Sequence, residues 1–183
     1  DEEGLEIMIE RNIPLVPTFT FQANLIDYAE KMEASTDYKE IFEKEIQDNV
    51  PIFTKAFAAG VPFICGSESG FSVTPYGDWH YKELEVFVEK LGLTPLEAIT
   101  CATKNAASAM KRDDIGLIAE GKIADLLVVD GDPSKDVTIL GNKNLIKHVF
   151  LNGKDIDLTP APKRFKDPDG WRISSYSNKI LEK

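Results

Sequence analysis

The chain has 183 residues and is acidic, with 31 aspartates and glutamates against 21 lysines and arginines and a net charge of −10. This charge would repel the phosphates of nucleic acids and of anionic membranes, so neither is an expected partner. No stretch reaches the roughly 20 apolar residues of a membrane span. Cys65 and Cys101 lie in apolar or small-residue surroundings typical of reduced thiols, and one disulfide between them is the alternative. We therefore expect a cytoplasmic protein.

The first part of the chain predicts an alternation of helices and strands. Residues 1–11 place their apolar side chains on one helical face. Residues 13–20 are apolar, β-branched and aromatic, and residues 61–67 form a short β-prone run, so both are predicted strands. Between them, a helical pattern allows a break at Pro51 and stops at Gly60.

Two further helices are predicted after the second strand. The first carries Leu84 and Phe87 on its apolar face and stops at Gly92. The second begins at Thr94-Pro95-Leu96-Glu97, which combines a capping box with proline at the first helical position, and continues to Met110.

Short β segments follow residue 114. They are predicted at residues 125–129, 146–151 and 154–156, and Asn152-Gly153 between the last two is a strong hairpin signal. The tail at 159–183 contains three prolines and shows no periodicity, so we expect it to wrap over a surface or to be mobile.

One acidic residue stands where a predicted strand ends. Gly66-Ser67-Glu68-Ser69-Gly70 directly follows the apolar run, and in α/β barrels chemistry is found at the C-terminal ends of the strands. Glu68 is therefore a candidate catalytic carboxylate. The alternative is a solvated carboxylate at a strand-to-loop turn.

The chain has few metal-binding side chains of the imidazole type. A hydrolytic zinc centre needs about three protein ligands, whereas the only histidines are His80 and His148. His148 lies within a predicted strand and is expected to be structural. His80 opens a helix near Glu68 and is expected to contact substrate or neighbouring groups, with a helix-start residue of no special role as the alternative.

Several segments occur in a fixed order along residues 1–157. They are Gly60-Val61-Pro62, Gly66-Ser67-Glu68-Ser69-Gly70, the loop from Phe71 to His80, Leu93-Thr94-Pro95-Leu96-Glu97-Ala98, Ala102-Thr103-Lys104-Asn105-Ala106-Ala107, and Ile115-Gly116 through Gly121-Lys122-Ile123-Ala124-Asp125-Leu126 to Asp130-Gly131-Asp132-Pro133. No single one of these motifs is specific, but their joint order is. In that order they resemble the C-terminal part of the metal-dependent amidohydrolase superfamily, and the most similar branch is that of the imidazolonepropionase-like and prolidase-like enzymes.

The resemblance implies an α/β fold, the C-terminal part of a (β/α)8 TIM barrel with its last two strands and helices, plus part of a small β-sandwich. It assigns residues 1–113 to the barrel, 114–158 to the sandwich and 159–183 to an extended tail. The first six strands, and most metal ligands, would lie outside the chain. Because two barrel strands leave open edges, we expect a homo-oligomer or a missing N-terminal barrel portion as partner.

The resemblance also implies a hydrolase of carbon-nitrogen bonds other than ordinary peptide bonds, acting on an amide, carbamate, urea or dipeptide-like small molecule. One or two divalent metal ions, usually zinc, would activate water, and Glu68 would be both metal ligand and proton shuttle to the leaving amine. The family has aspartate at this position. The extra methylene of Glu68 moves the carboxylate by about 1 Å, a displacement that can cost about a hundredfold in rate.

The loop after Glu68 is expected to line the mouth of the site. The expected substrate-binding residues are Ser69, Tyr76, Trp79 and His80. Core packing is the alternative for Trp79.

Two alternative functions remain. Within the enzyme class, the alternative activity is that of a Xaa-Pro-type dipeptidase. From another class, the alternative is a non-catalytic structural fragment that contributes to an oligomer.

Overall fold

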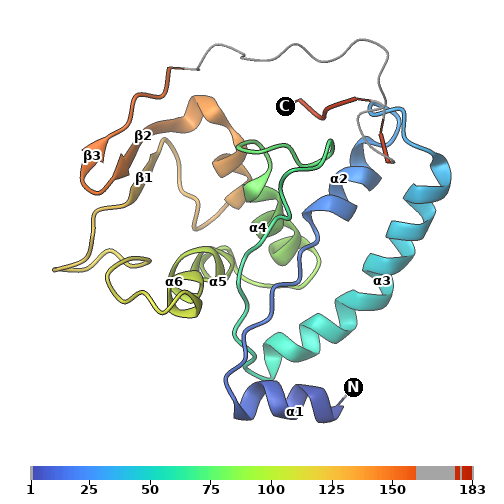
Figure 1. Ribbon diagram of the computed structural model, residues 1–183, viewed down its shortest axis with the longest axis horizontal. Coiled ribbons are helices and arrows are strands. Elements are labelled where there is room, and N and C mark those ends of the chain that lie inside the picture. Colours follow the sequence, from blue (N-terminus) through green and yellow to red (C-terminus); the bar gives the residue numbers. More distant parts are fainter. Residues whose placement is uncertain (1, 160–175, 178, 183) are drawn as a thin grey trace.

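Helices dominate the N-terminal two thirds of the chain, and a small antiparallel sheet follows them (Figure 1). The structure is a computed structural model that describes residues 2–159, 176, 177 and 179–182. No helix within these residues is long and apolar enough to cross a membrane. The elements are α1 (Glu2–Glu10), α2 (Thr20–Tyr28), α3 (Thr36–Ala58), α4 (His80–Glu89), α5 (Pro95–Thr100), α6 (Ala106–Ala109), β1 (Leu126–Val129), β2 (Ile146–Leu151) and β3 (Lys154–Asp155).

Local signals explain most helix boundaries. The predicted capping box at the start of α5 is confirmed, because Thr94 Oγ1 accepts a hydrogen bond from Glu97 N while the Glu97 carboxylate accepts one from Thr94 N at 2.8 Å. The break allowed at Pro51 does not occur, and α3 runs through it. Ile46 and Ala56 lie on either side of Pro51 and are buried in the same core, so packing holds both halves of the helix together.

The start of α2 has a long-range cause, which the sequence did not predict. Phe19, at the N-cap, makes no side-chain cap hydrogen bond. The carboxylate of Glu83, a fully buried residue of α4, instead accepts hydrogen bonds from Phe19 N at 2.9 Å, from Thr20 N at 2.8 Å and from Thr20 Oγ1 at 2.7 Å. A negative group is favourable at the N-terminus of a helix, so a side chain from another helix caps α2.

The two predicted barrel strands run in parallel next to each other, but they pair at one position only. Leu15 and Phe63 form an isolated parallel bridge. Leu15 N donates to Pro62 O and Ile64 N donates to Leu15 O, each at 2.9 Å. The predicted direction and adjacency of the two segments therefore agree with the structure, whereas the predicted strands do not extend into a ladder.

The opposite edge of the second segment is bonded to a π-helical turn. This turn, Cys101–Asn105, interrupts the helix that the sequence predicted to run on to Met110. Cys65 N donates to Cys101 O at 3.2 Å, and Asn105 Nδ2 donates to Phe63 O at 2.9 Å. Backbone groups on both edges of this short stretch thus have partners within the chain, and the expected open edge is smaller than the sequence suggested.

The C-terminal sheet follows the sequence prediction closely. Its order is β1-β2-β3, and both pairs are antiparallel. Asn152 and Gly153 connect β2 to β3 with φ values of 53° and 74°, the left-handed pair that a two-residue type I′ hairpin requires. Two 3₁₀ turns, Val137–Gly141 and Lys143–Leu145, were not predicted; Val137 is buried in the same core as α4 and so ties the sheet region to the helices.

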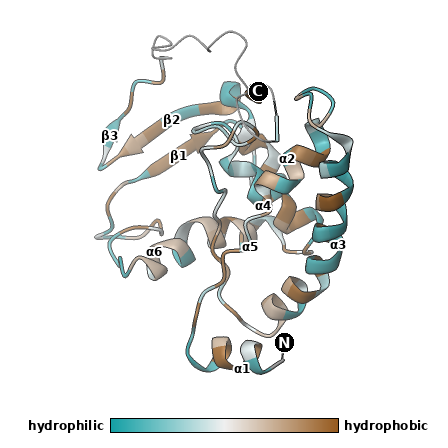
Figure 2. Cartoon of the chain, turned by 45° about the vertical axis from the view of Figure 1, so that its right-hand side comes forward, coloured by the Kyte–Doolittle hydropathy of each residue, from teal (hydrophilic) through white to brown (hydrophobic). Residues whose placement is uncertain are grey.

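Two apolar clusters form the core. The larger joins α2, α3 and α4 to the paired segments, and the smaller lies under the loop that follows Glu68. Hydrophobic and hydrophilic residues alternate along α3, as expected for a helix with one buried face (Figure 2). The fully or nearly fully buried members of the clusters include Phe63, Phe87, Ala98 and Cys101 in the larger and Leu25, Met32, Val73, Trp79 and Leu181 in the smaller.

The last described residues of the tail lie against the loop after Glu68 and near α2 (Figure 1). Leu181 N donates to Ser72 O at 2.7 Å, and the indole Nε1 of Trp79 donates to Leu181 O at 3.2 Å. For these residues the predicted wrapping over a surface is confirmed. The prediction for residues 160–175 lies outside the described residues.

Replacing Glu83 with glutamine should destabilise the protein. The amide has one acceptor oxygen in place of two, so its NH2 group must face a backbone donor at the start of α2, and the free energy of unfolding should fall by about 1 to 3 kcal/mol. Urea denaturation at neutral pH would measure this. Glu89→Gln, an exposed change on the same helix, is the control, and equal stabilities of the two variants would contradict this account of α2.

Adding a methyl group at Gly66 should also destabilise the protein, because a Cβ there would lie 2.5 Å from Val16 Cγ1. We expect Gly66→Ala to cost about 1 to 3 kcal/mol through overpacking. Val16→Ala removes the clashing atom and should recover most of that loss in the double variant. Additive effects in this double-mutant cycle would show that the two segments do not approach as closely as described.

Candidate functional site

Glu68 lies in a tight turn at the end of the second paired segment. Its side chain is exposed, and its φ of 47° is in the left-handed region that residues with a Cβ rarely adopt. Thr74 Oγ1 donates to Glu68 O at 3.3 Å, and Gly70 N donates to Thr74 O at 2.9 Å. Unfavourable backbone conformations of this kind are found at functional sites, but Glu33 and Lys111 share a positive φ, so the conformation alone does not mark Glu68 as catalytic.

The imidazole of His80 binds both neighbours of Glu68. Its Nδ1 lies 2.9 Å from Ser67 Oγ and 3.3 Å from Ser69 Oγ, and the two hydroxyl oxygens are 2.8 Å apart. Gly77 N donates to His80 Nε2 at 3.3 Å. Since a backbone N–H can only donate, Nε2 must be unprotonated, and the ring proton is assigned to Nδ1. Ser67 therefore accepts from His80, which excludes a serine nucleophile activated by this ring in the observed arrangement.

The two aromatic candidates have different environments. Tyr76 is 80% exposed, and its ring covers the turn, because a Cβ built at Gly70 would lie 3.0 Å from the Tyr76 hydroxyl oxygen. Trp79 is only 2% exposed and packs against Tyr28 and Tyr81, with ring centroids 5.2 and 6.1 Å away. The prediction that Trp79 lines the mouth is therefore not met, and the core packing held as its alternative describes its position.

The structure gathers the other predicted residues around the turn. Ser69 and His80 are in direct contact. The ring of Tyr76 lies close to Gly70, which follows Glu68 by two residues in the sequence. His148 is on β2, and its Nδ1 lies 2.8 Å from Asp155 Oδ2. That contact spans the hairpin, which agrees with the structural role expected for His148.

The residues around Glu68 do not make a metal centre by themselves. Among residues 2–159 and the described part of the tail, no three side chains of the His, Cys, Asp or Glu type come together. His80, the nearby histidine, uses both ring nitrogens in hydrogen bonds. Burial, with added repulsion from Glu83 and Cys101, raises the pKa of Cys65 to about 12, which keeps this thiol protonated and a poor ligand. Glu68 is the carboxylate carried by the turn itself, and its role as a metal ligand stays a prediction.

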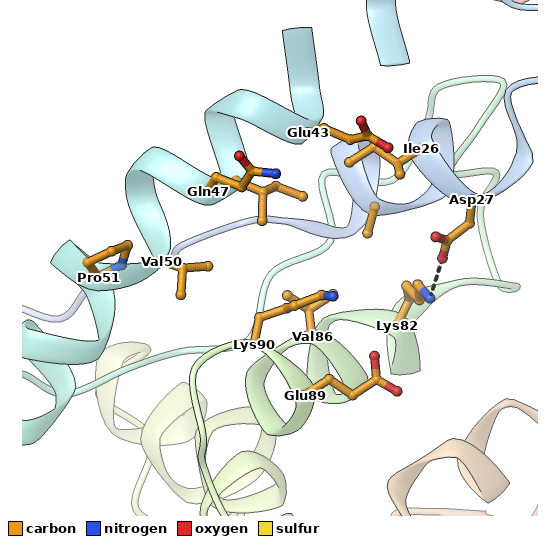
Figure 3. A pocket seen from close by; sticks show the side chains of 12 residues that line it. Ile26, Asp27, Glu43, Gln47, Val50, Pro51, Lys82, Val86, Glu89 and Lys90 are labelled. Atoms are coloured by element: carbon orange, nitrogen blue, oxygen red, sulfur yellow. Dashed lines mark hydrogen bonds and ion pairs between the residues drawn. The ribbon is translucent and has the colours of Figure 1, made fainter. Parts of the chain in front are cut away.

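A separate groove of about 620 Å³ lies between α2, α3 and α4 (Figure 3). Lys82 at its edge is buried and donates to Asp27 at 2.8 Å and to Glu85 at 2.5 Å. Burial alone would lower the pKa of Lys82, but the hydrogen bonds and the charge attraction of Asp27 and Glu85 together outweigh burial and raise it. The amine therefore stays charged and is no general base. None of the lining residues belongs to the turn at Glu68; the apolar ones include Ile26, Ile46, Val50 and Val86.

Sequence reasoning missed the roles of Glu83, which binds the end of the first paired segment, and of Asn105, which bonds Phe63 within the second. Glu83 precedes Phe87 by four residues, so a charged residue on the buried face of a helix was a usable signal. Burial raises the pKa of Glu83, while the hydrogen bonds from Thr20 and Phe19 oppose this shift. No local signal marked Asn105, because its partner Phe63 is 42 residues away.

The curated proteins that are similar to the chain in sequence include an ochratoxinase and an imidazolonepropionase. Ochratoxinase from Aspergillus niger is 29% identical over 159 residues, which are 84% of this chain and 31% of that protein. Imidazolonepropionase from Pyrobaculum arsenaticum is 53% identical over 47 residues, which are 26% of this chain and 12% of that protein. The chain thus spans less than a third of the length of either relative.

Solved structures extend the similarity to the fold. The crystal structure of A. niger ochratoxinase matches with a TM-score of 0.68 at 27% identity, over 85% of this chain and 34% of that one. A Xaa-Pro dipeptidase with bound methionine matches with a TM-score of 0.68 at 26% identity, over 86% of this chain and 37% of that one. These neighbours are amidohydrolase TIM-barrel proteins, and this chain corresponds to part of each. The model of the amidohydrolase family matches residues 2–156, and on that coverage the chain belongs to the amidohydrolase family.

Proposed function

We propose that the chain is the C-terminal part of a hydrolase that cleaves carbon-nitrogen bonds other than ordinary peptide bonds in a small-molecule substrate. Family membership supports this, as do the ochratoxinase, imidazolonepropionase and Xaa-Pro dipeptidase that resemble the chain. The observation that carries the proposal is the position of Glu68, exposed in a left-handed turn at the end of a segment paired in parallel with its neighbour. An amide, a carbamate, a urea or a dipeptide would fit this chemistry.

Glu68 would hold and transfer the proton in this reaction. Members of the family generally use a divalent metal, and we propose zinc, which when bound would supply an activated water. The carboxylate of Glu68 would accept a proton and pass it to the leaving nitrogen, which must be protonated to depart as an amine. No three potential ligands come together among the described residues, so we propose that further ligands come from outside them.

Exposed apolar side chains support the need for a partner region. Ile7 and Ile9 on α1, and Ile13 and Val16 just after it, are 37 to 45% exposed. These aliphatic groups lie on the stretch of chain that would be the seventh barrel strand and the helix before it. We propose that the N-terminal barrel portion, or a second copy of the chain, covers them. A cytoplasmic setting is also part of the proposal and follows from composition alone.

A non-catalytic structural fragment is the second candidate. The lack of any three-ligand cluster within the described residues favours it. Within the enzyme class, a Xaa-Pro-type dipeptidase is supported by the similarity to a Xaa-Pro dipeptidase structure. The two classes differ in whether supplying the missing barrel portion creates a metal site.

Metal content and hydrolysis should both depend on Glu68 once the upstream region is present. We expect zinc to be found by elemental analysis in the chain co-expressed with that region and to be absent from the chain alone. Glu68→Ala should lower the rate of amide hydrolysis by about 10² to 10⁴-fold, the usual contribution of a proton-transfer group. Glu68→Asp should retain metal, since it keeps the carboxylate.

Glu120→Ala, a change of an exposed glutamate in a loop, is the matched control and should leave metal content and rate unchanged. Absence of metal from both samples would contradict the hydrolase proposal and favour the structural fragment. Full activity of Glu68→Ala with metal bound would refute the proton-transfer role of Glu68 but not the hydrolase proposal.

A further inference from the structure

We propose that His80 is a positioning residue for Glu68, which it holds in a left-handed conformation by binding the serines on either side. The inference rests on the proposed role of Glu68 in proton transfer. It differs from the expected substrate-binding role of His80, because both ring nitrogens already have partners within the loop.

The conformation of Glu68 needs external support. At a φ of 47°, the Cβ of a residue comes close to the following carbonyl oxygen, so the extended and helical conformations are favoured in the free chain. Asparagine and aspartate relieve this strain with short side chains that bond locally, whereas glutamate is one methylene longer. The surroundings must therefore hold this backbone, as is usual for strained residues at sites.

His80 supplies that support through a single ring nitrogen, Nδ1, which lies close to both serine hydroxyls. Its Nδ1–H is directed to Ser67 Oγ at 2.9 Å, with Ser69 Oγ at 3.3 Å, and the two hydroxyls bond each other at 2.8 Å. The residue before Glu68 and the residue after it are thus drawn to one nitrogen atom. Chain extension at Glu68 would separate the two hydroxyls and break this triangle.

The ring itself is fixed from the other side. Gly77 N donates to Nε2 at 3.3 Å, which sets the orientation of the ring and places its proton on Nδ1. His80 is also the first residue of α4, three residues before Glu83, whose buried carboxylate fixes the helix against the start of α2. The core therefore fixes α4, and α4 in turn fixes His80, which bonds the turn that carries Glu68.

Nuclear magnetic resonance of the isotope-labelled chain tests this inference without metal or substrate. In the unmodified chain, we expect the ring nitrogens of His80 to show a proton on Nδ1 and none on Nε2. We also expect Glu68 to show the strong amide-to-Hα nuclear Overhauser effect within one residue that marks a left-handed backbone.

His80→Ala should lose this Glu68 signal, because the serines lose their common partner. His80→Asn should keep it, since the side-chain amide can donate to the serines from the place of Nδ1. His148→Ala changes the other histidine, which bonds Asp155 in the C-terminal hairpin, and should leave Glu68 unaffected.

A proton on Nε2 of His80 in the unmodified chain would overturn the proposal. So would a left-handed Glu68 in folded His80→Ala, or loss of the signal in His80→Asn. If His80→Ala does not fold, the ring-nitrogen measurement and His80→Asn still decide the question. Because these readouts need no activity, failure to find hydrolysis would refute the proposed function and leave this result standing.

Discussion

The buried carboxylate of Glu83 is the interaction on which the arrangement of this chain depends. It accepts hydrogen bonds from Phe19 and Thr20 at the point where the first paired segment ends and α2 begins. Burying a carboxylate is costly, and the desolvation raises its pKa, but three donors and the N-terminal end of a helix offset that cost. A helix start without a local cap thereby gains a fixed position against α4.

The helix α4 consequently serves as a common reference for both paired segments. Glu83 binds the end of the first segment, and His80, one turn earlier, binds the serines that flank Glu68 at the end of the second. The two segments, both fully described, form one backbone bridge, at Leu15 and Phe63. Their C-terminal ends are therefore placed by side chains of one helix more than by strand pairing, which explains how a short bridge suffices.

Features with local causes were predictable from the sequence, and those with distant causes were not. The capping box at Thr94 and the Asn152-Gly153 hairpin depend on neighbouring residues, and both are present as predicted. The start of α2 depends on Glu83, 63 residues further along, so periodicity and capping rules could not detect it. The chemistry of a tryptophan suits either a site mouth or a core. The packing of Tyr28, Tyr81 and the distant tail residue Leu181 around Trp79 decides between them, and the sequence alone did not reveal it.

The bonding of the second segment limits where an upstream region could complete the fold. Phe63 O and Cys65 N already bond the π-helical turn on the edge opposite Leu15, so a further strand would compete with that turn for these two groups. Beyond these two groups the segment runs through Gly66 to Glu68, where an upstream strand could still pair. If the upstream region supplies the missing ligands as proposed, closure of the barrel and completion of the site would take place at the same few residues, and the geometry of the turn that His80 holds would affect both.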